Sequence, residues 1–185
     1  MVVVGKYAGI GHRDSPDIIL ELMRHISVRL LREGFLMRSG GARGADRAFA
    51  ALLPPDRKEV FGWLDARGWA LEYAGTHCMP VDRKNFHLWK PYARGLIGRN
   101  MMQVLGENGD DPVDMVICYA RSFTYEKAED SGGTGYAVRC AILNQIPVFN
   151  LYSDDTTDRM LAFLDQDVMG FREFFRPEME RVCRF

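Results

Sequence analysis

The chain has 185 residues, of which 47% are hydrophobic and 26% charged, and its formal net charge is −1. This length and composition are typical of an ordinary globular protein, so we expect a single domain over residues 1–185. The small net charge excludes a globally basic nucleic-acid binder but permits a local basic cleft.

The beginning of the chain lacks the basic segment and long apolar stretch of a signal peptide. No apolar run approaches the roughly 18 residues that a membrane span needs. The four cysteines are widely spaced and form no CxxC pair, which is typical of free thiols in a reducing compartment. We therefore expect a cytoplasmic protein with no membrane partner.

Predicted strands and helices alternate along the chain. A buried strand is predicted over residues 2–10, followed by a helix with Ser15 as N-cap and Pro16 at its first position, ending at Glu33-Gly34. Further strands are expected at 35–37, 58–61, 113–119 and 147–151, and further helices at 45–53, 91–105, 133–145 and 156–164. This alternation predicts an α/β, Rossmann-like doubly wound fold, with a mainly parallel sheet and helices on both faces.

Two segments stand outside this alternation. Residues 62–90 have mixed aromatic and charged residues with little periodicity, and we interpret them as an insert with one short helix. Residues 171–185 are predicted to form a short C-terminal extension. The insert aromatics Trp63, Trp69, Tyr73 and Trp89 suit base stacking, although core packing explains them more simply.

Two glycine-rich loops follow predicted strands and run into predicted helices. The first lies within RSGGARGADRAF at residues 38–49, and the second is SGGTG at residues 131–135. Glycine permits close backbone approach, so such loops can offer amide N–H groups to an anion at the carboxyl edge of a parallel sheet. Neither loop has the GK[ST] or the full GxGxxG pattern, which disfavours nucleoside triphosphate hydrolysis and dinucleotide redox chemistry.

Arginines accompany these loops and favour an anionic ligand. Arg13 follows the first strand, and Arg38 and Arg43 flank the first loop. Arg47 stands in the first turn of a helix, where a cation opposes the helix dipole unless an anion is near. Taken singly, Arg38 and Arg47 are equally well explained as solvated surface charges.

The helix predicted over residues 91–105 carries two polar residues, Asn100 and Arg99, at different positions relative to its apolar face. Asn100 lies on its apolar face and needs a partner in the backbone or a ligand. Arg99 points away from that face, toward solvent, a crevice or a second subunit. The helix at 133–145 is apolar nearly all round, so we expect a further layer or a partner chain to cover it.

These motifs, taken in order, resemble a known family. GIGHRDSP, SGGARGAD, the Arg99-Asn100 pair, VDMVICY, SGGTGYAVRCA and IPVFNL resemble the core of the DprA (Smf) family of DNA-processing recombination mediators, within the SLOG superfamily, over residues 5–151. The resemblance implies binding of single-stranded DNA or a small phosphorylated nucleotide, no cofactor, and a homodimer. By matching positions it implies ligand contacts from Arg13, Ser39, Gly40, Gly41, Arg43, Gly44, Asp46, Arg99, Asn100, Ser131, Gly132, Gly133, Thr134 and Gly135.

Two alternatives remain open. The same superfamily contains phosphoribohydrolases similar to the LOG proteins, with a PGGxGTxxE loop, but here Arg139 stands at the place of the catalytic Glu. Glycosidic cleavage needs a carboxylate, so we expect binding rather than catalysis. If the chain is a nucleotide N-glycosidase, the candidate carboxylates are Asp46, Glu126, Glu129 and Asp130. A third hypothesis is a protein that senses or sequesters a small signalling nucleotide.

Two further expectations follow. We expect no metal site, because the spacing of His77, Cys78 and His87 does not match that of any common one. Under all three functional hypotheses, Arg43→Ala and Arg99→Ala should weaken ligand binding while leaving the fold intact.

Overall fold

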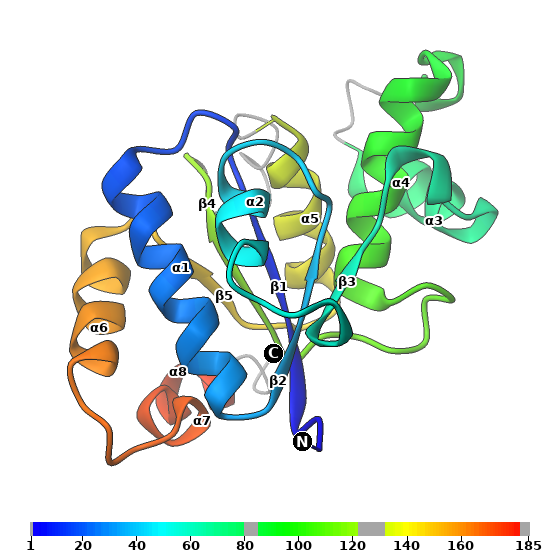
Figure 1. Ribbon diagram of the computed structural model, residues 1–185. Helices are drawn as coiled ribbons and strands as arrows, with labels where there is room; N and C mark the ends of the chain where they lie inside the picture. Colours follow the sequence, from blue (N-terminus) through cyan, green and yellow to red (C-terminus); the bar gives the residue numbers. More distant parts are fainter. Residues whose placement is uncertain (1, 80–84, 122–131, 182–185) are drawn as a thin grey trace.

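The computed structural model describes residues 2–79, 85–121 and 132–181, and within these ranges five parallel strands form one sheet in the order β3-β2-β1-β4-β5 (Figure 1). The strands are β1 (Gly5–Gly11), β2 (Phe35–Ser39), β3 (Lys58–Val60), β4 (Met115–Tyr119) and β5 (Val148–Asn150). The central strand β1 pairs with β2 on one side and with β4 on the other. The predicted α/β, Rossmann-like sheet is confirmed.

Helices cover both faces of this sheet (Figure 1). One face carries α1 (Asp17–Arg32), α2 (Ala45–Ala50), α6 (Asp154–Leu164), α7 (Phe171–Phe174) and α8 (Arg176–Arg181), and the other carries α3 (Gly68–Tyr73), α4 (Pro91–Leu105) and α5 (Gly132–Leu143). Successive strand side chains alternate between these layers, as a pleated strand requires. Met115 and Ile117 pack in the α1 layer, whereas Val116 and Cys118 pack in the α4 layer.

Most predicted bounds differ from the observed ones by a few residues, and three of the differences have a clear physical cause. The first strand begins at Gly5, because Val2 to Val4 are exposed and precede the residues that pair with β2. Ser15 does not cap α1: its hydroxyl donates to the carbonyl of His12 at 2.8 Å, and Pro16 is the N-cap residue. The helix expected to reach residue 53 ends at Ala50, and the Lys58 ammonium donates to the carbonyl oxygens of Ala50 and Leu53.

The insert packs on α4 through α3 and short helical turns at Trp63–Asp65, Ala74–Cys78 and Phe86–Leu88. Gly95 and Gly98 of α4 make this contact close, since a Cβ at either position would collide with Trp63 or Leu71. The insert therefore adds to the α4 layer.

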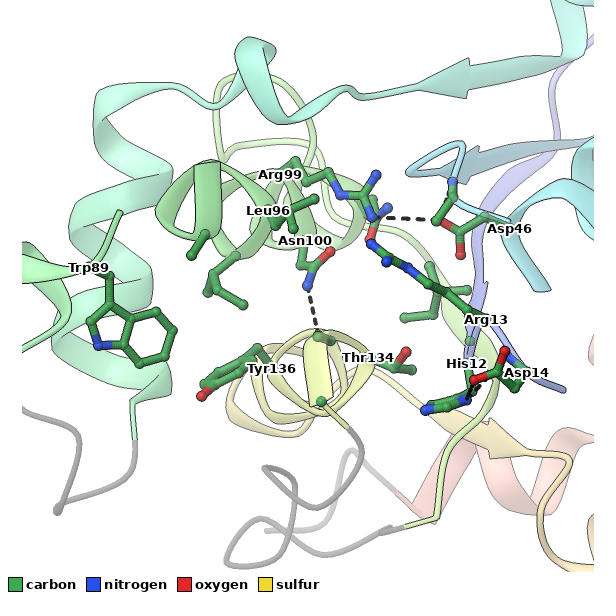
Figure 2. Close-up of a pocket in the computed structure, with 18 residues that line it drawn as sticks. His12, Arg13, Asp14, Asp46, Trp89, Leu96, Arg99, Asn100, Thr134 and Tyr136 are labelled. Carbon is green, nitrogen blue, oxygen red and sulfur yellow. Dashed lines mark hydrogen bonds and ion pairs between the residues drawn. The ribbon is translucent and has the colours of Figure 1, made fainter. Parts of the chain in front are cut away.

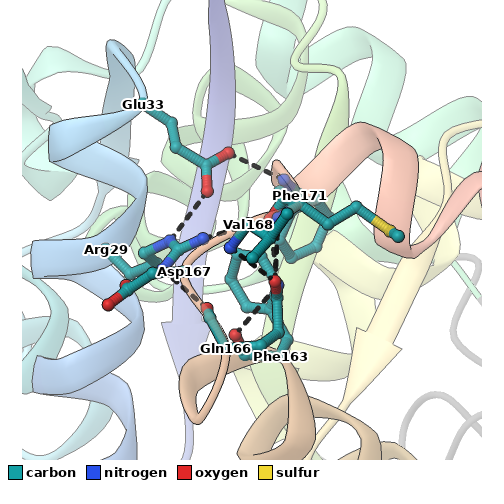
Figure 3. Close-up of polar contacts among 8 residues, drawn as sticks. Arg29, Glu33, Phe163, Gln166, Asp167, Val168 and Phe171 are labelled. Carbon is teal, nitrogen blue, oxygen red and sulfur yellow. Dashed lines mark hydrogen bonds and ion pairs between the residues drawn. The ribbon is translucent and has the colours of Figure 1, made fainter.

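The C-terminal segment is part of the core rather than a loose extension. Phe171 and Phe175 are buried beside Phe163 in the α1 layer. Arg29 of α1 holds the loop that precedes α7 (Figure 3). Its Nε donates to Glu33 at 2.9 Å, and its two Nη atoms donate to the loop carbonyls of Gln166 and Met169 at 2.9 and 3.0 Å.

The apolar helix α5 is covered by its own chain. It packs against α4, β4 and the Ala74–Cys78 turn, and the side chains from Tyr136 to Ala141 are buried. The apolar surface of α5 therefore gives no reason to expect a partner chain, and a homodimer stays a prediction. No helix within the described ranges has the length and apolar character to cross a membrane.

Candidate functional site

A crevice of about 460 Å³ opens at the carboxyl end of β1, next to β4. The strand order reverses between β1 and β4, and open parallel sheets bind ligands at such a reversal. The walls come from the loop after β1, the loop before α2, one face of α4, the start of α5, and Trp89 of the insert (Figure 2).

A buried ion pair forms the inner wall. Asp46 of α2 is buried, and its Oδ2 lies 3.8 Å from Nη2 of Arg99 on α4. The amide of Ala42 donates to the same Oδ2 at 3.2 Å. The pKa of Asp46 is raised by burial, which outweighs the opposing effects of Arg99 and of three loop amides.

Gly40 and Gly44 allow the first glycine-rich loop to approach this wall. Arg99 Nη1 donates to the carbonyl of Gly40, and a Cβ at Gly40 would collide with Arg99 and Gln103. Gly44 has φ +74°, and a Cβ there would collide with the carbonyl of Arg13. These close approaches are the structural reason for glycine at both positions.

Arg13 faces the same space as Arg99 (Figure 2). The pKa of Arg99 is lowered first by burial, and the charge of Arg13 acts in the same direction, whereas Asp46 opposes it. Two cations therefore share the crevice with one buried carboxylate. Asp14 lies at the exposed rim together with Arg13, whereas Arg99 and Asp46 face each other in the interior.

Two buried donors in this wall have no protein acceptor. Within the described part of the chain, neither Nε of Arg99 nor the side-chain nitrogen of Gln103 has a hydrogen-bond partner. Both residues line the crevice, and Gln103 is almost fully buried. Since unpaired buried donors are costly, they mark a place where a ligand acceptor would be stabilised.

The start of α5 forms the opposite wall. Gly132 and Gly133 are exposed there, and Thr134 and Tyr136 also line the crevice. Asn100 of α4 donates from Nδ2 to the carbonyl of Gly133 at 2.7 Å, which ties the two walls together (Figure 2). The first amides of a helix have no partner within the helix and favour negative charge.

The other end of the crevice is apolar. Trp89 and Tyr136 lie edge to face there with ring centroids 6.5 Å apart, beside Leu96 and Ile97 (Figure 2). A polar, cationic end and an aromatic end are thus joined in one cavity.

The structure brings half of the implied ligand residues together. Those that line the crevice are Arg13, Asp46, Arg99, Asn100, Gly132, Gly133 and Thr134. Gly40 and Gly44 do not line the crevice but contact Arg99 and Arg13, which do. Gly41 and Arg43 are exposed outside the crevice, and Gly135 is buried in α5. Ser39 is buried and donates to the carbonyl of Gly9 at 2.7 Å. Ser131, Glu126, Glu129 and Asp130 lie outside the described residues.

Two arginines, Arg38 and Arg139, are buried and bonded to other parts of the fold instead of lining the crevice. Arg38 is buried and pairs with Glu59 and Asp111, so it is neither a surface charge nor part of the crevice. Arg139 is also buried, and its Nη1 donates to the carbonyl of Cys78 at 2.9 Å. Arg47 is exposed on α2, as its surface interpretation required.

Sequence reasoning missed Gln103 and His12, which both line the crevice. Gln103 lies four residues after Arg99 on the same helix, and this spacing places both side chains on one face. The helical spacing from Arg99 was therefore a usable signal for Gln103.

Comparisons with known proteins agree with this fold. No protein-family model and no curated protein matches the sequence. A solved structure of DNA processing protein A from Helicobacter pylori, described for its single-stranded DNA binding mode, matches with a TM-score of 0.53 and 18% sequence identity. The match covers 97% of this chain and 82% of that chain. The chain is therefore similar in fold to a DprA protein over nearly its whole length.

Proposed function

We propose that the crevice binds the phosphate backbone of single-stranded DNA. The observation that carries this proposal is the pair of unpartnered donors, Arg99 Nε and the Gln103 amide nitrogen, in a wall shared with Arg13. The structural similarity to a protein described as binding single-stranded DNA supports the choice of ligand.

Phosphate oxygens suit this donor set better than a neutral group. Arginine donates charge-assisted hydrogen bonds to phosphate, and the first amides of α5 add donors from the opposite wall. Asp46 is already held by Arg99 and loop amides, so it does not offer a free acceptor to the ligand. The crevice therefore presents donors to its interior and keeps its carboxylate engaged.

Cations continue outside the crevice, which favours a strand over a single phosphate group. Arg13 is exposed at the mouth, and Arg43 and Arg47 are exposed on the loop before α2 and on α2 itself. A strand leaving the crevice would pass this rim. If Arg99 and these three arginines each contact one phosphate, the logarithm of the binding constant should fall against the logarithm of the salt concentration with a slope of about −3.

The first test is fluorescence anisotropy with a labelled single-stranded oligonucleotide at several salt concentrations. Arg99→Ala should lower affinity by about 2 kcal/mol, roughly 30-fold, because a buried charged donor is lost. Arg43→Ala should lower it less and reduce the salt slope. Arg24→Ala is the matched control, since Arg24 pairs with Glu21 on α1. Unchanged affinity in Arg99→Ala would contradict the proposal.

A small phosphorylated nucleotide is the second candidate ligand. The crevice volume of about 460 Å³ lies in the range of small-molecule sites, and its aromatic end suits a base. Such a ligand would raise the melting temperature by mass action, with a gentler salt dependence than a strand. The same anisotropy assay, with unlabelled mononucleotides as competitors, separates the two.

Binding without base release is the expected outcome for either ligand. Arg139, at the place of the LOG-type glutamate, is buried away from the crevice lining. Asp46 is the carboxylate that lines the inner wall, and its oxygens are engaged by Arg99 and amides. Release of free base from a nucleotide by the wild-type protein, lost in Asp46→Asn, would establish the N-glycosidase alternative.

A further inference from the structure

We infer that Tyr92 and Trp63 form a stacking platform for a base at the mouth of the crevice, adjacent to the phosphate held by Arg99. This inference rests on the proposed binding of single-stranded DNA and extends it to a second part of the nucleotide. It assigns a role to residues outside the lining of the crevice itself.

The platform continues the ligand-facing line of α4. At about 100° per residue, Tyr92, Arg99 and Gln103 fall within about 20° of one direction around the helix axis. Gln103 lies at the inner end of this line, Arg99 in the middle, and Tyr92 in the first turn, where the helix meets solvent. A strand whose phosphate contacts Arg99 therefore leaves the crevice along Tyr92.

Trp63 is held beside Tyr92 by the insert. The insert seats Trp63 against Gly95 of α4, three residues after Tyr92. The two rings meet edge to face with centroids 5.2 Å apart and an interplanar angle of 72°. Trp63 remains 37% exposed and Tyr92 50% exposed, so a fixed aromatic surface faces solvent at this point.

Among the other insert aromatics proposed for stacking, Trp69 and Tyr73 are engaged elsewhere and Trp89 serves the interior of the crevice, which leaves this pair for its mouth. Trp69 donates from Nε1 to the carbonyl of Glu107 at 2.8 Å and packs against the core. Tyr73 stacks on His77 and accepts a hydrogen bond from Asn144. Trp89 lies inside the crevice.

The occupant is a nucleobase rather than a protein side chain because the pair is continuous with the crevice that holds Arg13 and Arg99. Tyr92 precedes Arg99 by two turns on the same side of α4, so both face the same stretch of ligand. Bases of any sequence stack on aromatic rings, and such contacts accompany a charged groove in single-strand binders.

The experiment compares two labelled strands of equal length, one of ordinary single-stranded DNA and one abasic with the same phosphates. The wild-type protein should bind the ordinary strand about ten-fold more tightly. Tyr92→Ala should remove most of this preference and leave the affinity for the abasic strand unchanged, whereas Tyr92→Phe should keep the preference.

Tyr152→Ala provides a matched control. Tyr152 is also 50% exposed and also meets a neighbouring ring, that of Tyr119, edge to face at 5.5 Å, but it follows β5 at the edge of the sheet. Its replacement should change neither affinity.

The outcomes separate this inference from the proposed function. Equal affinity of the wild-type protein for both strands would overturn the platform and leave phosphate binding standing, whereas binding of neither strand would overturn both. Unchanged affinity for the ordinary strand in Tyr92→Ala would also overturn the platform and would point to a protein partner for this surface. Equal losses for both strands in Tyr92→Ala would make the residue merely structural.

Discussion

Two arginines with the same exposure, Arg29 and Arg99, have opposite surroundings. Both side chains are 11% exposed. Each of the three guanidinium nitrogens of Arg29 has an acceptor in the loop before α7 or on α1 (Figure 3), and the group also lies 4.9 Å from the centroid of the Phe163 ring. Arg99 (Figure 2) donates to the carbonyl of Gly40, but within the described residues its Nε has no partner, and neither has the side-chain nitrogen of Gln103.

The difference separates an arginine that serves the fold from one that is available to a ligand. A buried cation with every nitrogen paired stabilises the structure around it, and its removal leaves acceptors unpaired. A buried cation with a spare donor costs stability until an acceptor arrives. The two arginines have the same charge and the same exposure, so what distinguishes them is whether every guanidinium nitrogen has a hydrogen-bond acceptor.

The largest expected effect is a loss of stability when Arg29, the fully paired arginine, is replaced. Arg29→Met should lower the free energy of unfolding by about 3 kcal/mol, since it removes the group that joins α1 to the loop before α7. Denaturant unfolding measures this change. DNA affinity of the folded variant should stay at the wild-type value. Arg32→Met, an exposed arginine on the same helix, should stay within about 0.5 kcal/mol, and a similar loss there would refute the assignment.

A smaller effect of opposite sign is expected at the unpaired site. Gln103→Met should raise the free energy of unfolding by about 1 kcal/mol, because a buried amide nitrogen without a partner in the described residues is replaced by an apolar chain of similar length. The same variant should bind DNA several-fold more weakly. Asn100→Leu is the contrast, since its amide is paired with Gly133 and its loss should destabilise. A destabilised Gln103→Met variant would show that the amide is satisfied in solution.

The smallest expected effect is a pH dependence of stability that comes from Asp46, the carboxylate paired with Arg99. Burial raises the pKa of Asp46, so between the usual aspartate pKa and the raised value the native state binds more protons than the unfolded state. The contribution of this group to stability therefore falls as pH rises through that window. The stability of Asp46→Asn relative to wild type should be highest at neutral pH and should decline as pH falls toward 4.

Asp111 supplies the opposite sign as a control. The Lys6 ammonium beside it is the largest cause of a lowered pKa, and Arg38 acts in the same direction. Its contribution is present above the usual aspartate pKa and is lost as pH falls through the lowered value. Urea unfolding of Asp46→Asn and Asp111→Asn, each against wild type from about pH 2 to 7, covers the windows on both sides of the usual aspartate pKa, and parallel pH profiles would contradict these trends.

The sequence predicted the elements better than the partners of individual side chains. The helix at residues 91–105 agrees with α4 at both ends, because Pro91 and Gly106 are local signals. The crevice position followed from strand and loop order. Arg38 was misjudged because its partners Glu59 and Asp111 come from distant segments of the chain. The buried tail was missed because short aromatic segments show no periodicity before the core that receives them is known.

Helix α4 has a consequence for how this protein could diversify. One side of the helix carries the insert on Gly95 and Gly98, and another presents Arg99 and Gln103 to the crevice. Asn100 fixes the same helix to α5. The insert is thus mounted on the helix that also bears Arg99 and Gln103, without supplying either residue itself. Under the proposed function, an exchanged insert would leave the contact with the DNA backbone in place and change what is recognised next to it.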